Sequence, residues 1–313
     1  MPPARHLLIP FAAGHQLPRP ERADDELPHL AELLRRLRPQ AQTVCEPDSP
    51  AMPYEQVLAG LLGLPAEPGR TPWAAFETRT TGLPCGWVKP CHLQVGADQV
   101  RLGDTALLAL EEADSRALLE AAAPYFAEDG MRLSYMNPTA WLATGEPLRD
   151  LLTWSTERLA GRQLAPDVLR FNGSRFAALW RRLQNEMQML FYTHRVNDER
   201  AQRGQLPVNA IWLSGAGELA TLPAPAPHVV VDNRLCDSAL ALDATAYRQA
   251  WQTVDADSCS QLLQDCRAGQ PVRLTLAGER SAITYAPQPA SLRERLGALF
   301  GARPSVAAAL DAL

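Results

Sequence analysis

The side chains with the clearest chemical potential lie within one short segment of this chain, residues 184–217. His194, Asn197 and Arg200 follow one another there at steps of three, so on a continuous helix they would share roughly a third of its circumference. Such a face offers an imidazole, an amide and a guanidinium. This combination suits an anionic or phosphorylated ligand, because arginine binds phosphate bidentately and the other groups supply directional hydrogen bonds.

The same side chains also have a purely structural interpretation. The last carbonyls of a helix have no partner within it, and polar residues near its C-terminus commonly satisfy them. Asn197 and Arg200 would then bond backbone carbonyls and fix the loop that follows the helix. The sequence leaves both interpretations open.

A buried strand is predicted over residues 208–213, and a glycine turn over residues 214–217 follows it. Backbone N–H groups in such a turn can approach an anion closely. The glycines also fit a dinucleotide fingerprint, but prolines within residues 223–227 stand where its crossover helix would begin. We therefore predict a small-anion site with these ligand-binding residues: His194, Asn197, Arg200, Asn209, Ser214, Gly215 and Gly217.

No catalytic residue and no metal ligand is predicted. The chain contains no G-x-S-x-G nucleophile elbow, no H-E-x-x-H zinc motif and no phosphate-binding P-loop. Cys85, Cys91 and His92 form the most zinc-like cluster, but a structural zinc site needs a fourth ligand and closer spacing. Ordinary buried thiols are the expectation.

Composition excludes several classes of protein. Of the 313 residues, 46% are hydrophobic and 21% are charged, as in folded globular proteins. The formal net charge of −5 argues against nucleic-acid binding, which needs a basic face. No run approaches the ~18 consecutive apolar residues of a membrane span, and the cysteines lack C-x-x-C pairs. We expect a cytoplasmic protein that binds neither nucleic acid nor membrane.

Hydrophobic spacing predicts alternating strands and helices. Residues 7–13 form a buried first strand rather than a signal peptide, because the apolar run is short and contains Pro10. One long helix runs from Ser174 to near Gly204. The other predicted elements are helices over residues 27–37, 54–64, 114–126 with Asp114 as N-cap, 244–253, 260–267 and from 291; strands over 131–135, 141–143, 228–232, 272–276 and 281–285; a hairpin of 86–95 with 99–102; and a loop over 65–84.

This alternation without a repeat favours an α/β class, a layered fold with a mixed, largely central sheet flanked by helices. The length fits a single α/β domain over residues 1–301, or two lobes of it. Residues 302–313 form an Ala-rich tail, for which we expect disorder or a loosely docked end.

The polar segment resembles one in the archaeal-type, cofactor-independent phosphoglycerate mutases, over roughly residues 191–217. The resemblance implies the fold of the alkaline-phosphatase superfamily, in which two metal ions held by Asp and His activate a Ser or Thr nucleophile. The family has an Asp-Gly pair after its first strand, where this chain has residues 10–14 without a carboxylate. The chain also lacks a Gly-Asp-His triplet. Within the segment, Arg195 replaces the family's Pro and Ser214 replaces its Arg.

A wider resemblance is to a bacterial group, the RpfE-type regulatory proteins. It includes RLQNEMQML at residues 182–190, LPVN at 206–209 and PCHLQVGAD at 90–98, and it extends over most of the chain. This group is similar to the mutases and is linked by name to the regulation of pathogenicity factors. The resemblance implies a regulatory protein with a mutase-like fold.

The sequence thus predicts a phosphoglycerate-mutase-like regulatory protein without the two-metal centre and without a cofactor, which binds a small anionic or phosphorylated molecule. The alternative is an active metal-dependent phosphomutase or phosphatase that holds two divalent ions such as Mn or Zn. Its ligands would have moved, for example to Asp98, Asp104, Asp232 or His228. A third possibility, a protein-interaction scaffold, would require an exposed apolar surface; no protein partner is predicted.

Overall fold

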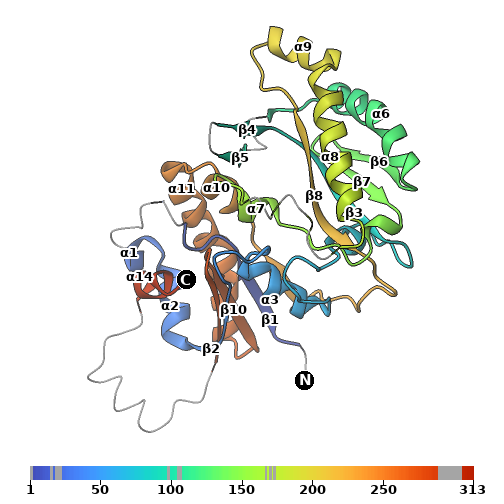
Figure 1. Cartoon of the computed structure of the whole chain (residues 1–313). Helices are drawn as coiled ribbons and strands as arrows, with labels where there is room; N and C mark the ends of the chain where they lie inside the picture. Colours follow the sequence, from blue (N-terminus) through green and yellow to red (C-terminus); the bar gives the residue numbers. More distant parts are fainter. Residues whose placement is uncertain are drawn as a thin grey trace. The chain divides into compact units, whose positions relative to one another are not determined.

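The chain forms two compact units, each with its own sheet (Figure 1). Unit 1 comprises residues 1–48, 52–62 and 225–313, and unit 2 comprises residues 49–51 and 63–224. The computed structural model describes residues 3–14, 17, 23–96, 99–103, 108–165, 168, 171, 174–287 and 305–313.

Unit 1 contains a mixed five-stranded sheet with the strand order β2-β11-β10-β1-β9. β1 pairs in parallel with β10 and β9, whereas β11 pairs antiparallel with β10 and β2. Helices flank this sheet, so the predicted α/β class with a mixed sheet is confirmed. The strands are β1 (Arg5–Ile9), β2 (Leu37–Val44), β9 (Val229–Val231), β10 (Val272–Ala277) and β11 (Ser281–Pro287).

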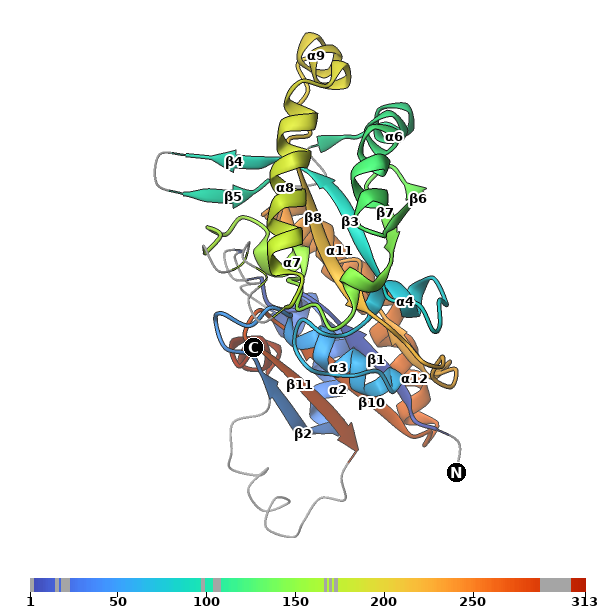
Figure 2. The same cartoon turned by 45° about the vertical axis from the view of Figure 1, so that its right-hand side comes forward.

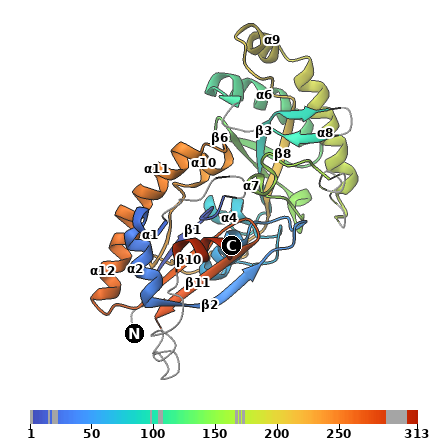
Figure 3. The same cartoon turned by 90° about the vertical axis from the view of Figure 1, so that its left-hand side faces the viewer.

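One face of this sheet is covered by α2, α11 and α12 (Figure 3). Leucines that repeat along α2 are buried in the core together with Leu274 and Leu276 of β10, as the predicted apolar stripe requires. α3 contacts β1, β2 and β11. The helices are α1 (Ala23–Glu26), α2 (Pro28–Arg36), α3 (Pro53–Leu62), α10 (Cys236–Leu240), α11 (Ala244–Val254), a π-helical turn (Asp255–Cys259), α12 (Ser260–Arg267) and α14 (Val306–Asp311).

The end of the chain is docked, which corrects the expected loose tail. Ser305 caps α14 by accepting a hydrogen bond of 3.1 Å from the Ala308 N–H. Val306 and Leu310 are buried in the unit 1 core. Alanine favours helix strongly, and a buried apolar pair anchors the short helix. The helix predicted from residue 291 lies outside the described residues.

Unit 2 contains a four-stranded antiparallel sheet with the order β6-β7-β3-β8. The predicted hairpin is present only in its second part, where β4 pairs with β5, because most of its expected first arm is β3 of the four-stranded sheet. The strands are β3 (Cys85–Cys91), β4 (Leu93–Val95), β5 (Val100–Leu102), β6 (Arg132–Asn137), β7 (Ala140–Thr144) and β8 (Ala210–Gly217). The turn of the hairpin includes residues 97–98, which lie outside the described residues.

Two long helices, α6 and α8, cover one face of the unit 2 sheet (Figure 2). Phe126 of α6 and Trp180, Met187 and Phe191 of α8 are fully buried there against Trp141 of β7. None of the helices in the described ranges is long and apolar enough to cross a membrane. The helices are α4 (Trp73–Glu77), α6 (Glu112–Glu128), a 3-10 turn (Glu146–Leu148), α7 (Thr156–Leu159), α8 (Ala177–Tyr192) and α9 (Arg195–Gln202).

Several predictions for individual elements were wrong. The strand expected over residues 7–13 is β1 and ends at Ile9, and Phe11 in the turn that follows has a φ of +55°. The expected loop over residues 65–84 contains the short helix α4, and the expected long helix is divided into α8 and α9. β8 continues through the expected glycine turn, because both its neighbours, β3 and α4, cover residues 214–217. β2 was not predicted because most of its side chains are exposed, so no apolar pattern marks it.

A buried histidine makes the stability of unit 1 depend on pH. His6 in β1 is 2% exposed, and its Nε2 shares a hydrogen bond of 2.7 Å with Thr275 Oγ1. Thr275 in turn bonds Thr284 Oγ1 at 2.7 Å. Burial, followed by the charges of Arg273 and His228, lowers the pKa of His6 from 6.5 to about 4.

We expect the titration of His6 to lower the free energy of unfolding by about 2 kcal/mol when the pH falls from 7.5 to 5. Its pKa is lower in the folded state, so the unfolded chain binds the extra proton, and the stabilisation is complete above pH 6.5 and declines toward pH 4. Urea unfolding at both pH values measures this loss. The glutamine in His6→Gln does not titrate, so the decrease in unfolding free energy between the two pH values should be smaller in this variant than in wild type by about the same 2 kcal/mol. Equal decreases in both proteins would contradict the prediction.

Candidate functional site

His194 stands at the break between α8 and α9. α8 ends at Tyr192, and His194 is the N-cap of α9. Its Nδ1 accepts a hydrogen bond of 3.3 Å from the Val196 N–H, as an N-cap side chain does. The half-buried imidazole therefore closes the turn between the two helices, and it does not continue a face of α8.

Asn197 fastens the end of α8 to the approach of β8. This buried side chain donates from Nδ2 to the carbonyl oxygens of Phe191 and Val208, each at 2.7 Å. Its Oδ1 accepts from the Val208 N–H at 2.9 Å. An amide can make about four hydrogen bonds, so little of its capacity is left for a ligand.

Arg200 is fully buried and joins separate stretches of unit 2. Its Nε donates to Leu206 O at 2.9 Å, and one terminal nitrogen donates to Leu108 O. The other terminal nitrogen forms an ion pair of 3.3 Å with Asp114 Oδ2, which Arg203 also contacts at 2.6 Å.

Asp114 therefore has a different role from the predicted N-cap. It lies in the first turn of α6, and Glu111 occupies the cap position. The carboxylate points to α9 because a buried guanidinium requires a negative partner. The sequence could not identify this pairing, since Asp114 and Arg200 are far apart in the chain.

Asn209 attaches β4 to the start of β8. Its Oδ1 accepts from the Leu93 N–H at 2.7 Å, and its Nδ2 donates to Leu93 O at 2.9 Å. The Asn209 N–H donates to Cys91 O at 3.1 Å. The side-chain amide thus imitates a backbone pair and extends the sheet by one position.

Residues 214–217 are the last part of β8, and their glycines have a packing explanation. Ser214 is buried and pairs with Trp87 of β3. Gly215 has a φ of +59°, and a Cβ there would lie 3.0 Å from Trp73 Cβ. Glycine therefore allows both this backbone conformation and the close approach of α4.

The structure does not bring all seven predicted ligand-binding residues to one place. His194, Asn197 and Arg200 belong to α9 and its cap, and Asn209 precedes β8. A strand rises about 3.3 Å per residue, so Ser214 lies about 16 Å beyond Asn209. The contacts of Asn197 and Arg200 are those of the structural interpretation. Ligand binding by this set stays a prediction.

The residues that would hold two metal ions do not fit such a centre. In the described ranges, no three His, Cys, Asp or Glu side chains group in a way that could bind a metal. Burial raises the pKa of Cys85 to about 11 and that of Cys91 to about 12, so both side chains are protonated thiols at neutral pH. His92 Nδ1 bonds Pro207 O at 2.9 Å.

The carboxyl ends of parallel strands are a common ligand site in α/β sheets, and at this edge Asp232 follows β9. Arg234 bonds it twice, from Nε to Oδ1 at 2.9 Å and from a terminal nitrogen to Oδ2 at 2.6 Å. Ser258 Oγ donates to Oδ2 at 2.6 Å, and Arg234 also pairs with Asp257 at 2.7 Å. Burial raises the pKa of Asp232, but these hydrogen bonds outweigh it and lower the pKa below its usual value.

The relocated metal ligands of the alternative prediction do not come together either. His228 precedes β9 and Asp232 follows it, so they are about 13 Å apart along an extended strand. That distance is too long for two ligands of one ion. Asp98 and Asp104 lie outside the described residues.

A cleft of about 210 Å³ lies between α8 and the start of β8. The cleft was not predicted from the sequence. A signal for it is present, because the amides within residues 184–188 and the buried Leu183 and Met187 mark a polar and an apolar face of one helix. The cleft is lined by Leu93, Arg181, Gln184, Asn185, Gln188, Ala210 and Ile211.

Comparison with known proteins gives no family membership. No family model matches the chain, and no curated protein matches it. Among similar solved structures, a cofactor-independent phosphoglycerate mutase from Thermoplasma acidophilum is 16% identical with a TM-score of 0.35, over 92% of this chain and 91% of that chain. The PH0037 protein from Pyrococcus horikoshii is 13% identical with a TM-score of 0.40, over 93% and 89%. These values assign no residue role and no activity to this chain.

We expect Arg200→Ala to lower the free energy of unfolding by about 3 kcal/mol, because it removes a buried ion pair and the donors of two buried carbonyls. Urea unfolding measures the change. Arg203→Ala is the matched control: it removes the exposed partner of the same carboxylate, and we expect a loss below about 1 kcal/mol. Equal stability of Arg200→Ala and wild type would rule out the structural role.

Proposed function

We propose that this chain is a phosphoglycerate-mutase-like regulatory protein that binds a small anionic molecule and does not catalyse metal-dependent phosphoryl transfer. The resemblance of its polar segment to the mutases supports the mutase-like part. The wider resemblance to the RpfE-type proteins supports a regulatory role. The ligand would bind through side chains of the α/β framework described above.

The observation that carries the non-catalytic part is the environment of Asp232. A metal centre needs carboxylates whose negative charge is available to the ion. Here Arg234 bonds both oxygens of Asp232 and also pairs with Asp257, so both oxygens of this carboxylate are already engaged by a guanidinium. A divalent cation would have to displace a bidentate ion pair.

The observation that favours ligand binding is that Arg200 and Arg181 of unit 2 differ in their contacts with the rest of the protein. Arg200 is buried and fully engaged with the protein, and therefore supports the structure. Arg181 lies on the cleft beside α8. A guanidinium on a cleft can recognise a carboxylate or a phosphate. The alternative, a metal-dependent phosphomutase or phosphatase, would require metal ligands outside the described residues, for example Asp98 and Asp104.

We expect the purified full-length chain to bind no stoichiometric Mn²⁺ or Zn²⁺ and to show no metal-dependent turnover. The measurements are metal analysis, and assays with 3-phosphoglycerate and p-nitrophenyl phosphate after chelation and re-addition of Mn²⁺, Mg²⁺ or Zn²⁺. Thermal unfolding with phosphorylated and carboxylated metabolites should show at least one that raises the melting temperature.

An active cofactor-independent phosphoglycerate mutase assayed in parallel is the positive control. Metal-dependent turnover by this chain would overturn the non-catalytic part of the proposal. A thermal shift by none of the metabolites would overturn the ligand-binding part.

A further inference from the structure

We infer that the cleft beside α8 is the ligand site and that it selects a small hydroxylated carboxylate. This inference rests on the proposed function and specifies its site and its ligand. The cleft lies entirely within unit 2, between α8 and the segments that begin at Leu93 and Ala210.

The polar wall of the cleft is one face of α8. Arg181, Gln184, Asn185 and Gln188 have the spacing i, i+3, i+4 and i+7, which places their side chains side by side along the helix. In the described part of the chain, none of these four side chains makes a hydrogen bond or an ion pair. Their donors and acceptors are therefore available to a bound molecule.

The charge of the cleft favours an anion with a single negative charge. Among the described residues that line the cleft, Arg181 is the one charged residue and none is a carboxylate. The cleft lies along the body of α8, so the N-terminal dipole of the helix does not contribute. A carboxylate carries one charge, whereas a phosphate monoester carries about −1.5 to −2 at pH 7. One guanidinium therefore matches a carboxylate better than a phosphate.

The remaining side chains indicate hydroxyl groups on the ligand. Each amide of Gln184, Asn185 and Gln188 offers both a donor and an acceptor, and a hydroxyl group can use both. The opposite wall is apolar, with Leu93, Ala210 and Ile211, and can contact the carbon skeleton. The volume of about 210 Å³ is below the ~300–1,000 Å³ of drug-sized sites, so a short molecule is expected.

The walls are held in place by the residues of the polar segment. Asn209 bonds both backbone groups of Leu93, one of the apolar residues of the cleft. Asn197 connects the last turn of α8, the helix of the polar wall, to Val208, which lies two residues before Ala210 of the apolar wall. These are positioning residues, and they fix the cleft before a ligand arrives, which lowers the ordering cost of binding.

The test uses the full-length chain and isothermal titration calorimetry with sodium D-gluconate, D-glucose and glucose 6-phosphate. We expect gluconate to bind, glucose to show no binding, and glucose 6-phosphate to bind more weakly than gluconate. Arg181→Gln should raise the dissociation constant for gluconate about tenfold or more, because a charged hydrogen bond is lost.

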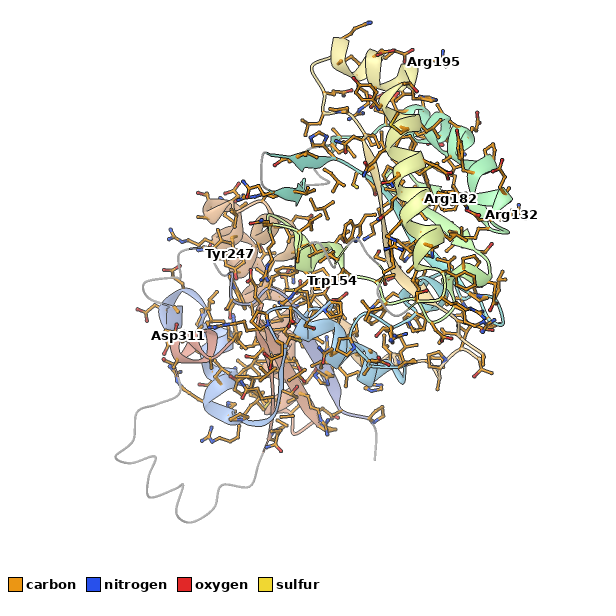
Figure 4. All side chains as sticks on the ribbon, in the orientation of Figure 1. Arg132, Trp154, Arg182, Arg195, Tyr247 and Asp311 are labelled. Atoms are coloured by element: carbon orange, nitrogen blue, oxygen red, sulfur yellow. The ribbon has the colours of Figure 1, made fainter. Side chains whose placement is uncertain are left out.

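Arg182→Gln is the matched control. Arg182 is the neighbouring arginine on α8 (Figure 4). It pairs with Asp129 and Glu186 and does not line the cleft. We expect less than about a twofold change in gluconate binding from this variant. Gln188→Glu is a second variant on an exposed position, and its added negative charge should abolish gluconate binding without unfolding the protein.

The possible failures can be separated. Absence of gluconate binding to wild type, or gluconate binding that is unchanged in Arg181→Gln, would overturn the cleft assignment. If glucose 6-phosphate also binds and is insensitive to Arg181→Gln, an anion site exists elsewhere and the proposed function stands. Tighter binding of glucose 6-phosphate than of gluconate through Arg181 would overturn the carboxylate selectivity.

Discussion

A buried positive charge is the constraint on which unit 2 depends. Arg200 has no exposed surface, and a guanidinium without partners in such a place would cost several kcal/mol. Its partners are Asp114, at the start of α6, and the carbonyls of Leu108 and Leu206. Satisfying one side chain therefore joins residues 108–114 to residues 200–206, two stretches that are far apart in the sequence. Asn197 extends this fixation to the end of α8.

The arginines have different roles, depending on whether a carboxylate of the protein balances their charge. Arg200 and Arg234 have carboxylate partners inside their own units, and their hydrogen-bonding capacity is directed to protein atoms. Arg181 lies on a cleft that has no carboxylate among the described residues of its lining. Composition shows only that arginine is abundant. The contacts show that Arg181, unlike Arg200, is not engaged by another side chain, and its place on the cleft is what suits it to recognition, since a site is recognised by geometry and charge and not by residue type alone.

Much of the fold could be predicted from the sequence where burial is one-sided. α11 and α12 were predicted to within about one residue, because their apolar residues repeat at the helical period. β2 gave no such signal because it is largely exposed. The division of α8 from α9 was missed because His194 ends one helix pattern and caps the next, and polar residues on either side look alike. For the candidate site, the sequence revealed neither the contacts of Arg200 nor the cleft. The partner of Arg200 is 86 residues away in the chain. The cleft depends on which side chains make no contact with the rest of the protein, and no local sequence pattern reveals that.

The contacts explain how a polar segment can support binding when its own side chains are engaged with the protein. Asn209 holds Leu93, and Asn197 holds α8 against the approach of β8, so both walls of the cleft depend on amides from this segment. A ligand that enters fixed walls loses less free energy to ordering the protein than one that must assemble them. The polar segment would then hold the cleft walls in place, while the side chains on the face of α8 would contact the ligand. In this arrangement the structural interpretation of Asn197 and Arg200 is compatible with the proposed binding function, because the contacts made by the segment would hold the walls that a ligand site requires.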